Sequence, residues 1–484
     1  MAAPNNLAEQ ISAKIDEVRT NAPNTEFKVI TDAGYGQICV GPIVTSPSQL
    51  CDLASPFHDA APPRFSLPHK SPVWVGTTFR NWPIEHAGFS QWVIRLSPHF
   101  RQSWIDTGIH DLIELCKASR PIAKHYIMGA FLFWSSAVNC FCFKSGPMTV
   151  TLLDLALMLN VPLNGERINP NLRADAPKFN LSKAQKSYGA FVKLFMGEEP
   201  YKPDRNEHIA FLAFFIAEYI LCTSSFRVTE DCFLLATALA DGRRCNLGEF
   251  ILAHLYRSLG DIAPLKDPRT FKCPGGPLWI VQLWLALYFP ELFEVGPPIK
   301  DELCGFQLIS AGTRLPHVLD VLQVFNNHSI RSPELMCPAL QLTYPPSWLL
   351  AGWDVEDLEE AVQADPRLKL GGPYWGIALK CRNLISRLDY DRSGVEPYCS
   401  NFVSRQFGFC QGLPYPLLIA FNNRGTHRAS IENYSELQYI ISLNKAYIPP
   451  LSELSRPIFT PSCTPEFTNW WTSIVQNSFD LSPK

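Results

Sequence analysis

Residues 278–289 read LWIVQLWLALYF, and this stretch decides the class of the fold. Pro277 precedes it and Pro290 follows it, in the places where proline favours the first turn of a helix and prevents its continuation. A helix that crosses a membrane needs about 20 apolar residues, and this stretch has only twelve residues. We therefore predict a helix that is apolar on all sides and buried in the core of a globular protein.

A second apolar stretch, residues 208–222, reads HIAFLAFFIAEYILC and is also too short to cross a membrane. The first 20 residues are polar and mixed in charge, without the apolar segment of a secretory signal. The fifteen cysteines include no CxxC pair, which is typical of a reducing compartment rather than of a disulfide scaffold. We expect a soluble intracellular protein with no membrane-spanning segment.

Two amphipathic helices carry recognisable start signals. Thr151 is the expected cap of a helix with Asp154 near its positive end, and the apolar face of that helix comprises Leu152, Leu155, Ala156 and Leu159. Asn246 is the expected cap of another helix, with Glu249 at the capping-box position and Gly260 just past its end. The buried side of that second helix comprises Leu247, Phe250, Ile251, His254 and Leu255.

The same kinds of pattern predict the other elements. Further helices are expected at residues 8–18, 111–117, 121–134, 229–239, 314–325, 354–363, 374–388, 402–407 and 466–477, the last with Thr464 as its cap. One hairpin is expected at residues 27–40, with its turn at 32–36, and another across residues 139–151 around a Gly-Pro turn. The predicted fold class is mainly α: a large multi-helix globular domain with one or two small β-hairpins.

Composition limits the possible partners. The chain has 484 residues, 46% of them hydrophobic, 18% charged, and a formal net charge of −3. This is not the charge of a dedicated nucleic-acid-binding protein. Basic residues nevertheless recur in two groups, which are Lys183, Lys186 and Lys193, near Tyr188, and Arg382, Arg387, Arg392 and Arg405. The three lysines are spaced for one side of a helix. Both groups could bind nucleic-acid phosphates, and solvated helix faces explain them equally well.

No catalytic signature stands out. Gly34 and Gly36 begin like a dinucleotide-binding loop, but Cys39 occupies the third glycine position, and P-loop, HExxH and GxSxG motifs are absent. Cys245 and His254 lack the second pair of ligands that a structural zinc site needs. We therefore predict no enzyme activity, no catalytic residue, no cofactor and no metal.

Several strings resemble the plant mobile domain, also called the aminotransferase-like plant mobile domain. They are Phe133-Trp134 with NCFCF at 139–143 and MTVTLLD at 148–154, EHIAFL at 207–212 with ALADGRR at 238–244, GGPLWIVQLW at 275–284, VSRQFGF at 403–409, and NWW at 469–471. Cys140 and Cys410 depart from the residues that are frequent there, as does the pair Lys144-Ser145. Each string alone is weak, but they occur in the family's order over most of the chain.

The resemblance implies a protein of the MAIN-like kind. Such proteins are nuclear and are associated with transposon and gene silencing, genome stability and meristem maintenance, and they act with a protein phosphatase 7-like partner. The resemblance implies no catalytic residue set, despite the aminotransferase label. A transposon-derived nucleic-acid-binding protein is the alternative, and an aminotransferase-like enzyme is a more distant one.

The family strings also supply candidate interaction residues. These are Trp279, Trp284, Arg243, Arg244, Arg405, Gln406, Phe407, Trp470 and Trp471. Tryptophan and arginine dominate many binding interfaces, whereas a buried aromatic core and a buried, paired arginine are the simpler interpretation. The two interpretations, a binding interface and a buried core, differ in whether Arg405, Arg243 and Trp279 converge on an open groove.

The resemblance and the proline pattern together predict three regions. Residues 1–72 form an N-terminal extension with a hairpin and a proline-rich connector, residues 73–473 form the helical plant mobile domain, and residues 474–484 form a C-terminal tail.

Overall fold

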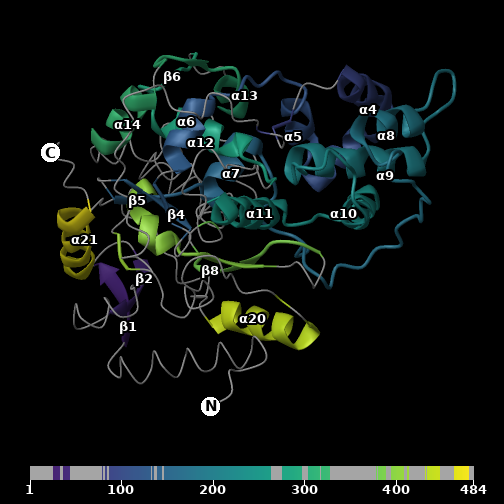
Figure 1. Ribbon diagram of the computed structural model, residues 1–484. Helices are drawn as coiled ribbons and strands as arrows, with labels where there is room; N and C mark the ends of the chain where they lie inside the picture. The colour runs from purple at the N-terminus through teal and green to yellow at the C-terminus, as the bar shows by residue number, and fades with distance from the viewer. Residues whose placement is uncertain are drawn as a thin grey trace, which may run out of the picture.

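The computed structural model gives a mainly helical protein with small antiparallel sheets, which confirms the predicted fold class (Figure 1). The structure describes residues 26–32, 36–43, 79, 82–83, 87–131, 133–135, 139–143, 146–262, 275–296, 304–316, 318–327, 378, 380–388, 394–407, 411–413, 431, 433–446 and 463–478. The helices predicted at 8–18 and 354–363 lie outside these residues.

The helices follow one another closely through the first two thirds of the chain. They are α4 (Ala87–Thr107), α5 (His110–Leu115), α6 (Lys124–Phe131), α7 (Leu152–Leu159), α8 (Tyr188–Phe195), α9 (Arg205–Phe215), the π-helix η2 (Ile216–Ile220), α10 (Glu230–Ala240), α11 (Leu247–Ile262), α12 (Trp279–Tyr288), α13 (Cys304–Ile309) and α14 (Val318–Asn327). After them come the 3₁₀ helix η7 (Ser400–Phe407), α20 (Tyr434–Ala446) and α21 (Pro465–Ser478).

The helices form two neighbouring groups. In Figure 1, α4, α8, α9 and α10 gather on the right, while α6, α7, α11 and α12 occupy the middle of the molecule. The π-helix η2 continues α9 directly, so residues 208–220 of the apolar stretch form one helical segment with a widened last turn. Nearly all side chains of α9, η2 and α12 are buried, so both predicted apolar helices lie inside the protein. No helix among the described residues is long and apolar enough to cross a membrane.

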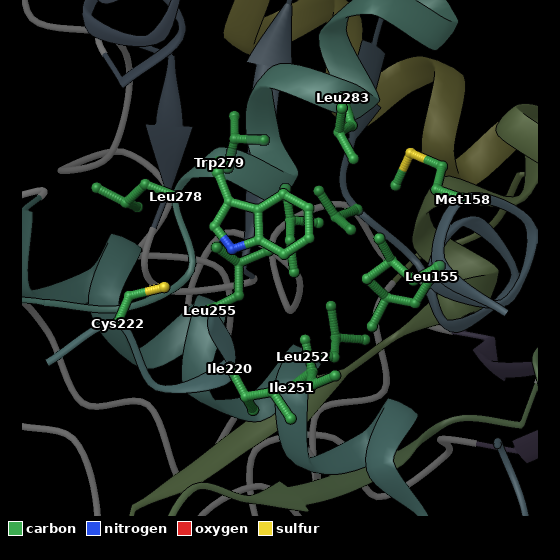
Figure 2. Packing of buried hydrophobic residues seen from close by; sticks show 14 of the residues in the cluster. Leu155, Met158, Ile220, Cys222, Ile251, Leu252, Leu255, Leu278, Trp279 and Leu283 are labelled. Carbon is green, nitrogen blue, oxygen red and sulfur yellow. The ribbon is translucent and has the colours of Figure 1, made fainter. Parts of the chain in front are cut away.

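Trp279 packs at the centre of the core in Figure 2, surrounded by side chains from α7, η2, α11 and α12. It is 2% exposed, and its indole Nε1 donates a hydrogen bond to the backbone oxygen of Tyr219 at 3.0 Å. Leu155, Ile251 and Leu283 are buried around it. The helix is apolar on every side because it has neighbours on every side, as its sequence predicts.

A second aromatic cluster joins α12 to the small sheet. Trp284 is fully buried and stacks on Phe141 with 5.2 Å between ring centroids. Phe289 lies edge-on to Phe143 at 5.3 Å and to Phe325 of α14 at 5.1 Å. Rings in these offset and edge-to-face arrangements add to the free energy gained by burial alone.

Both predicted hairpins are present. β1 (Glu26–Asp32) pairs with β2 (Gly36–Ile43), and β4 (Cys140–Phe143) pairs with β5 (Gly146–Met148). The second hairpin gains a third strand, β3 (Trp134–Ser135), which pairs with β4. Two more two-stranded sheets form between β6 (Phe293–Glu294) and β7 (Gly312–Thr313) and between β8 (Arg382–Ile385) and β9 (Val395–Tyr398).

The predicted caps are confirmed. Thr151 and Asp154 form a reciprocal capping box at the start of α7. The Asn246 side chain accepts a hydrogen bond from the Glu249 backbone N–H at 3.1 Å, and the Thr464 hydroxyl accepts one from Phe467 at 3.2 Å. The Glu249 carboxylate, however, turns away from the cap and pairs with Arg382 of β8 at 2.9 Å.

One predicted helix is wrong. Residues 374–388 were expected to be helical, but Arg382–Ile385 is strand β8, paired with β9. The Asn444 side chain of α20 bonds both backbone groups of Asn383, with the N–H donating at 2.8 Å and the oxygen accepting at 2.8 Å. These partners come from later in the chain, and a local periodicity cannot reveal them.

Several helix boundaries also differ from the prediction. α6 ends at Phe131 instead of Trp134, because Trp134 begins strand β3, which pairs with β4. α11 passes through Gly260 and ends at Ile262, so this glycine is inside the helix rather than beyond it. α6 begins at Lys124 instead of Pro121, because the carbonyl of Pro121 and the backbone N–H of Ala123 bond the Gln282 side chain of α12. α14 begins at Val318, after Pro316, instead of at Arg314.

Trp284→Ala is predicted to lower the free energy of unfolding by about 3–5 kcal/mol, because a fully buried ring is replaced by a cavity. Ile94→Ala on α4 is the matched control, since Ile94 is 68% exposed, and its effect should stay within about 0.5 kcal/mol. Guanidinium unfolding followed by far-ultraviolet circular dichroism measures both. Equal losses in the two variants would contradict the packing described here.

Candidate functional site

A pocket of about 280 Å³ opens where the helical body meets the segment after β8. Its walls come from η2 and the turn after it, from α10 and α11, from the loop before α12, and from the residues after β8. The lining consists of Ile216, Leu221, Thr223, Ser224, Ser225, Thr229, Asp231, Leu235, Phe250, His254, Arg257, Ser258, Asp261, Gly275, Gly276, Arg387 and Leu388. The pocket therefore combines an apolar lining with hydroxyl groups and charges of both signs.

His254 lies on α11 and is 7% exposed. Its Nε2 lies 3.2 Å from the backbone oxygen of Leu221. Burial, with the positive charges of Arg387 and Arg257, lowers the pKa of His254 to about 3, so the imidazole is neutral at physiological pH. A carbonyl oxygen only accepts hydrogen bonds, so Nε2 carries the proton and Nδ1 is left as an acceptor. Within the described part of the chain, Nδ1 has no hydrogen-bond partner.

Arg257 lies one turn after His254 on the same helix. Its side chain is 22% exposed, and its Nη1 lies 3.9 Å from Oε1 of the fully buried Glu396 on β9. Across the part of the molecule that the structure describes, Nη1 is a buried atom without a hydrogen bond. Gly394 allows this approach, because a Cβ there would come within 2.4 Å of the same nitrogen.

The glycine pair before α12 shapes another wall of the pocket. Gly276 has a φ of +95°, and an added Cβ would lie 1.9 Å from the Ser258 hydroxyl oxygen. Its backbone N–H donates to the Leu221 oxygen at 3.1 Å, and the Ser258 hydroxyl donates to the His254 oxygen at 2.9 Å. Only glycine combines this backbone conformation with so close an approach.

A second polar cluster lies inside the protein, around Asp154. This carboxylate accepts hydrogen bonds from the Thr151 N–H and hydroxyl at 2.8 Å each, from the Tyr288 hydroxyl at 2.8 Å, and from Gln406 Nε2 at 3.1 Å. Burial raises the pKa of Asp154 to about 6, although all of these donors oppose that shift. The cluster joins α7, α12 and η7.

Gln406 is the member that comes from the far end of the chain. Its Nε2 also donates to the Thr149 oxygen at 2.7 Å, and its Oε1 accepts from the Thr149 N–H at 3.0 Å. The side-chain amide thus forms the two hydrogen bonds to the Thr149 backbone that a neighbouring strand would form. It is 1% exposed, so its polar atoms are engaged inside the protein.

Arg405 is also buried, at 7% exposed. Its Nε donates to Gln411 Oε1 at 2.8 Å, and its guanidinium lies over the Phe467 ring at 5.9 Å. Gly146 is required beside it, because an added Cβ at that residue, which has a φ of +134°, would overlap the guanidinium. Of the two interpretations of this residue, a buried and paired arginine is the one that the structure shows.

Trp470 and Trp471 of α21 belong to the same interior. They are 4% and 7% exposed, and they pack with Phe467 and Phe402, with ring centroids about 6 Å apart. Arg243 instead lies near the surface, where it forms a two-pronged ion pair with Glu166. Arg244 is exposed, and its backbone oxygen accepts a hydrogen bond from the Glu166 N–H at 2.8 Å.

The candidate residues therefore do not converge on one groove. Trp279, Trp284, Arg405, Gln406, Trp470 and Trp471 are buried, whereas Arg243 and Arg244 are at the surface. The side chain of Phe407 lies outside the described residues. Because the tryptophans fill the core, we correct the hypothesis that Trp279 and Trp284 present an interface.

Residues 108–303 match the family model of the plant mobile domain. This segment of the chain is similar to the plant mobile domain. No curated protein and no solved structure matches the chain. The match lies within the predicted region 73–473. The start and end of that region stay a prediction. Asp154, Tyr288, His254, Arg257 and the glycine pair all belong to the matched segment, whereas Gln406, Arg405 and Arg387 follow it.

The basic residues singled out from the sequence do not form one face in the described part of the chain, and Arg392 lies outside that part. Lys183 precedes the helix that carries Lys193, and Lys186 pairs with Glu230 at 2.9 Å. Arg382 is 2% exposed and pairs with Glu249. The prediction that Lys183, Lys186 and Lys193 share one helix side is wrong, because residues 183–186 form a turn and α8 starts at Tyr188.

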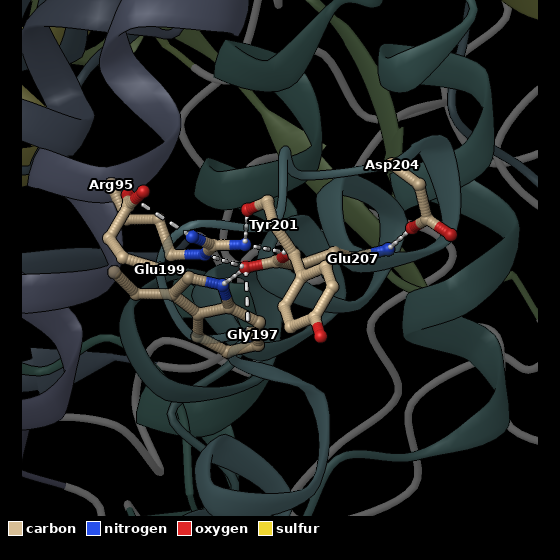
Figure 3. Close-up of polar contacts among 7 residues, drawn as sticks. Arg95, Gly197, Glu199, Tyr201, Asp204 and Glu207 are labelled. Atoms are coloured by element: carbon tan, nitrogen blue, oxygen red, sulfur yellow. Dashed lines mark hydrogen bonds and ion pairs between the residues drawn. The ribbon is translucent and has the colours of Figure 1, made fainter.

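A polar cluster that the sequence did not predict joins α4, which precedes the matched segment, to α9 within it. Glu207 of α9 binds Arg95 of α4 through Oε1 at 2.8 Å and Oε2 at 3.1 Å, and the Trp92 indole N–H donates to Oε1 at 3.1 Å (Figure 3). The Gly197 N–H donates to the same oxygen at 3.1 Å. Asp204 caps α9 through the Glu207 N–H at 2.8 Å, and that cap was the only local signal.

No group of three or more histidine, cysteine or acidic side chains that could hold a metal ion occurs among the described residues. The ten cysteines for which the structure describes a state are free thiols, mostly buried. Cys245 is buried, but its sulfur contacts the Arg243 oxygen at 3.7 Å rather than His254.

The Asp154 cluster predicts a specific pH dependence of stability. The pKa of Asp154 is about 6 in the folded protein and about 3.9 in an unfolded chain. The folded state therefore binds this proton more tightly, and the stabilisation is complete below about pH 4 and is lost as the pH rises through about 6. Urea unfolding between pH 4 and 7 should show this fall in wild type and not in Asp154→Asn.

Tyr288→Phe provides a second readout of the same cluster. It removes one donor to the carboxylate, so it should raise the pKa of Asp154 further and move the fall in stability to higher pH. If wild type, Asp154→Asn and Tyr288→Phe give parallel curves over the whole pH range, the pKa of Asp154 is not raised in the folded protein.

Proposed function

We propose that this chain is a non-enzymatic nuclear interaction protein of the MAIN-like kind, acting in transposon and gene silencing, genome stability and meristem maintenance. The plant mobile domain match over residues 108–303 supports the family part of the proposal. The nuclear location and the protein phosphatase 7-like partner rest on the resemblance of the motifs. The proposal needs no cofactor.

The single observation that supports the interaction role is that most of the motif side chains are buried and bonded inside the protein. Gln406 and Asp154 bond each other, and Arg405 bonds Gln411 inside the protein. Trp279 and Trp284 fill the core. Side chains held this firmly in the interior maintain a rigid body, which leaves the exposed surface of that body available for partners.

Arg244 is a motif residue that a partner can reach. It is exposed, and its backbone is held in place by Glu166, while its neighbour Arg243 is committed to the ion pair with Glu166. An exposed arginine on a fixed backbone has the chemistry of an interface contact, because its guanidinium offers five donors without first being ordered.

Affinity capture of the tagged full chain from plant nuclei tests the proposal. We expect recovery of a protein phosphatase 7-like protein together with chromatin-associated silencing factors. Recovery of neither, from an extract in which the bait is nuclear and folded, would count decisively against an interaction role. Salt-sensitive binding of DNA or RNA by the purified chain at physiological ionic strength would favour the alternative, a transposon-derived nucleic-acid-binding protein.

Arg244→Glu is predicted to lower partner recovery at least tenfold without changing the unfolding midpoint of the protein. Lys178→Glu is the matched control, because it also reverses the charge of an exposed side chain outside the family strings. Quantitative mass spectrometry of parallel captures measures both. A loss of equal size in the control would show that overall charge, rather than this position, governs recovery.

A further inference from the structure

Three basic side chains with accessible surface lie near the first turn of α11, and we call them the basic surface. Arg244 is exposed, and Arg167 and Lys380 are half-buried. None of the three forms an ion pair or a side-chain hydrogen bond with another residue in the part of the chain that the structure describes. Cations without a carboxylate partner attract anions, the more so where burial has removed part of their hydration.

The backbone places Arg167 and Arg244 next to each other. The Glu166 oxygen accepts a hydrogen bond from the Asn246 N–H at 2.8 Å, and the Glu166 N–H donates to the Arg244 oxygen at 2.8 Å. The side-chain stem of Arg244 passes over Gly165, where an added Cβ would lie 3.4 Å from its Cγ. Arg167 follows Glu166 directly, so it lies beside the start of α11 as well.

Lys380 reaches the same place from the segment before β8. Its backbone oxygen accepts a hydrogen bond from Arg382 Nη1 at 3.2 Å, and Arg382 Nε lies 2.9 Å from Oε1 of Glu249 in the first turn of α11. Partial burial and, after it, the positive charges of Arg382 and Arg167 lower the pKa of Lys380 to about 8. The Glu249 carboxylate opposes this shift without removing it.

Two carboxylates lie next to the basic surface, and both are already paired. Glu166 forms the two-pronged ion pair with Arg243, and Glu249 pairs with Arg382. Each of these carboxylates therefore neutralises an arginine that does not belong to the basic surface. The positive charge of the basic surface itself is not neutralised within the described residues.

We propose that the basic surface binds an acidic segment of a partner protein, whose Asp and Glu carboxylates pair with Arg244, Arg167 and Lys380. The proposal rests on the proposed interaction role and names the chemistry of the partner that contacts Arg244. Complementary charge selects such a partner and speeds its association. Guanidinium groups also bind carboxylates through two parallel hydrogen bonds, which adds geometric specificity.

A protein segment suits this surface better than a nucleic-acid backbone does. A nucleic-acid backbone is bound by basic residues that follow one another along a face. Lys183 and Lys193 belong to the region of α8, in the other group of helices (Figure 1), so they do not extend the basic surface. The net charge of the chain is −3, which repels a long polyanion. A short acidic segment needs only the few contacts that three cations provide.

Fluorescence polarisation of the purified full chain with a labelled peptide of six glutamates tests the proposal. We expect saturable binding that weakens as salt is added, and a labelled peptide of six glutamines is the uncharged control. Equal affinities for the two peptides would overturn the proposal. An oligothymidine with six phosphate charges is the third probe, and binding of it as tight as that of the glutamate peptide, or tighter, would assign the surface to nucleic acid instead.

Two double variants with the same loss of charge locate the site. Arg167→Gln combined with Lys380→Gln should weaken binding of the glutamate peptide at least roughly fivefold. Arg227→Gln combined with Lys193→Gln removes two exposed cations outside the basic surface and should leave the affinity unchanged. Equal losses in the two double variants, both with circular dichroism like that of wild type, would show that net charge alone governs binding and would overturn the site.

The pH dependence of binding identifies the contribution of Lys380. Its ammonium loses its proton as the pH rises through about 8, whereas glutamate side chains stay ionised. Binding of the glutamate peptide should therefore weaken between pH 7 and 9 in wild type and change far less in Lys380→Gln. A lysine with the ordinary pKa of about 10.4 would keep its charge over this range, so equal affinities at pH 7 and 9 would contradict a role for Lys380.

These titrations and the capture from nuclei can fail separately. Peptide binding that is retained while no nuclear partner is recovered would contradict the proposed nuclear role and leave the basic surface in place. Recovery of nuclear partners by a chain that does not bind the glutamate peptide would contradict the basic surface alone.

Discussion

The Asp154 carboxylate holds together parts of the chain that local sequence does not connect. It caps α7 through Thr151, binds Tyr288 at the end of α12, and accepts a hydrogen bond from Gln406 more than two hundred residues later. Each bond comes from a different element, so the three elements adopt one relative position. The cost of burying the charge is visible in its raised pKa, and the donors around it offset that cost.

This arrangement explains why so many family-motif residues are internal. The MTVTLLD string provides the last residue of β5, the cap and the carboxylate. The VSRQFGF string provides Gln406, which bonds Thr149 and Asp154 from outside the matched segment, and Arg405, which lies beside Gly146 of β5. The GGPLW string provides Gly276, whose backbone passes close to Ser258, and Trp279 at the centre of the core. Such strings specify a framework, and function then depends on surfaces and cavities that the framework positions.

The sequence predicted the parts of this framework that local physics determines. The apolar helix at 278–289, the capping box at Thr151 and the hairpin around residues 140–148 follow from periodicity, cap chemistry and turn residues, and all three are present. Strand β8 was missed because its partners lie beyond the reach of a helical period: β9 pairs with it after an intervening segment, and Asn444 bonds Asn383 from 61 positions away. The ion pair between Arg95 and Glu207 was missed for the same reason, since it joins residues 112 positions apart.

The pocket could be predicted only in part, and α11 shows why. Its 3.6-residue period placed His254 on the buried stripe with Ile251 and Leu255, which is correct as far as burial is concerned. Periodicity cannot show that the next turn carries Arg257 toward Glu396, or that Arg387 arrives from beyond β8.

The same helix thus packs against the tryptophan core on one side and lines the pocket on another, while Glu249 in its first turn holds β8 through Arg382. The position of β8 therefore depends on the same helix that carries part of the tryptophan core, so the two are placed together.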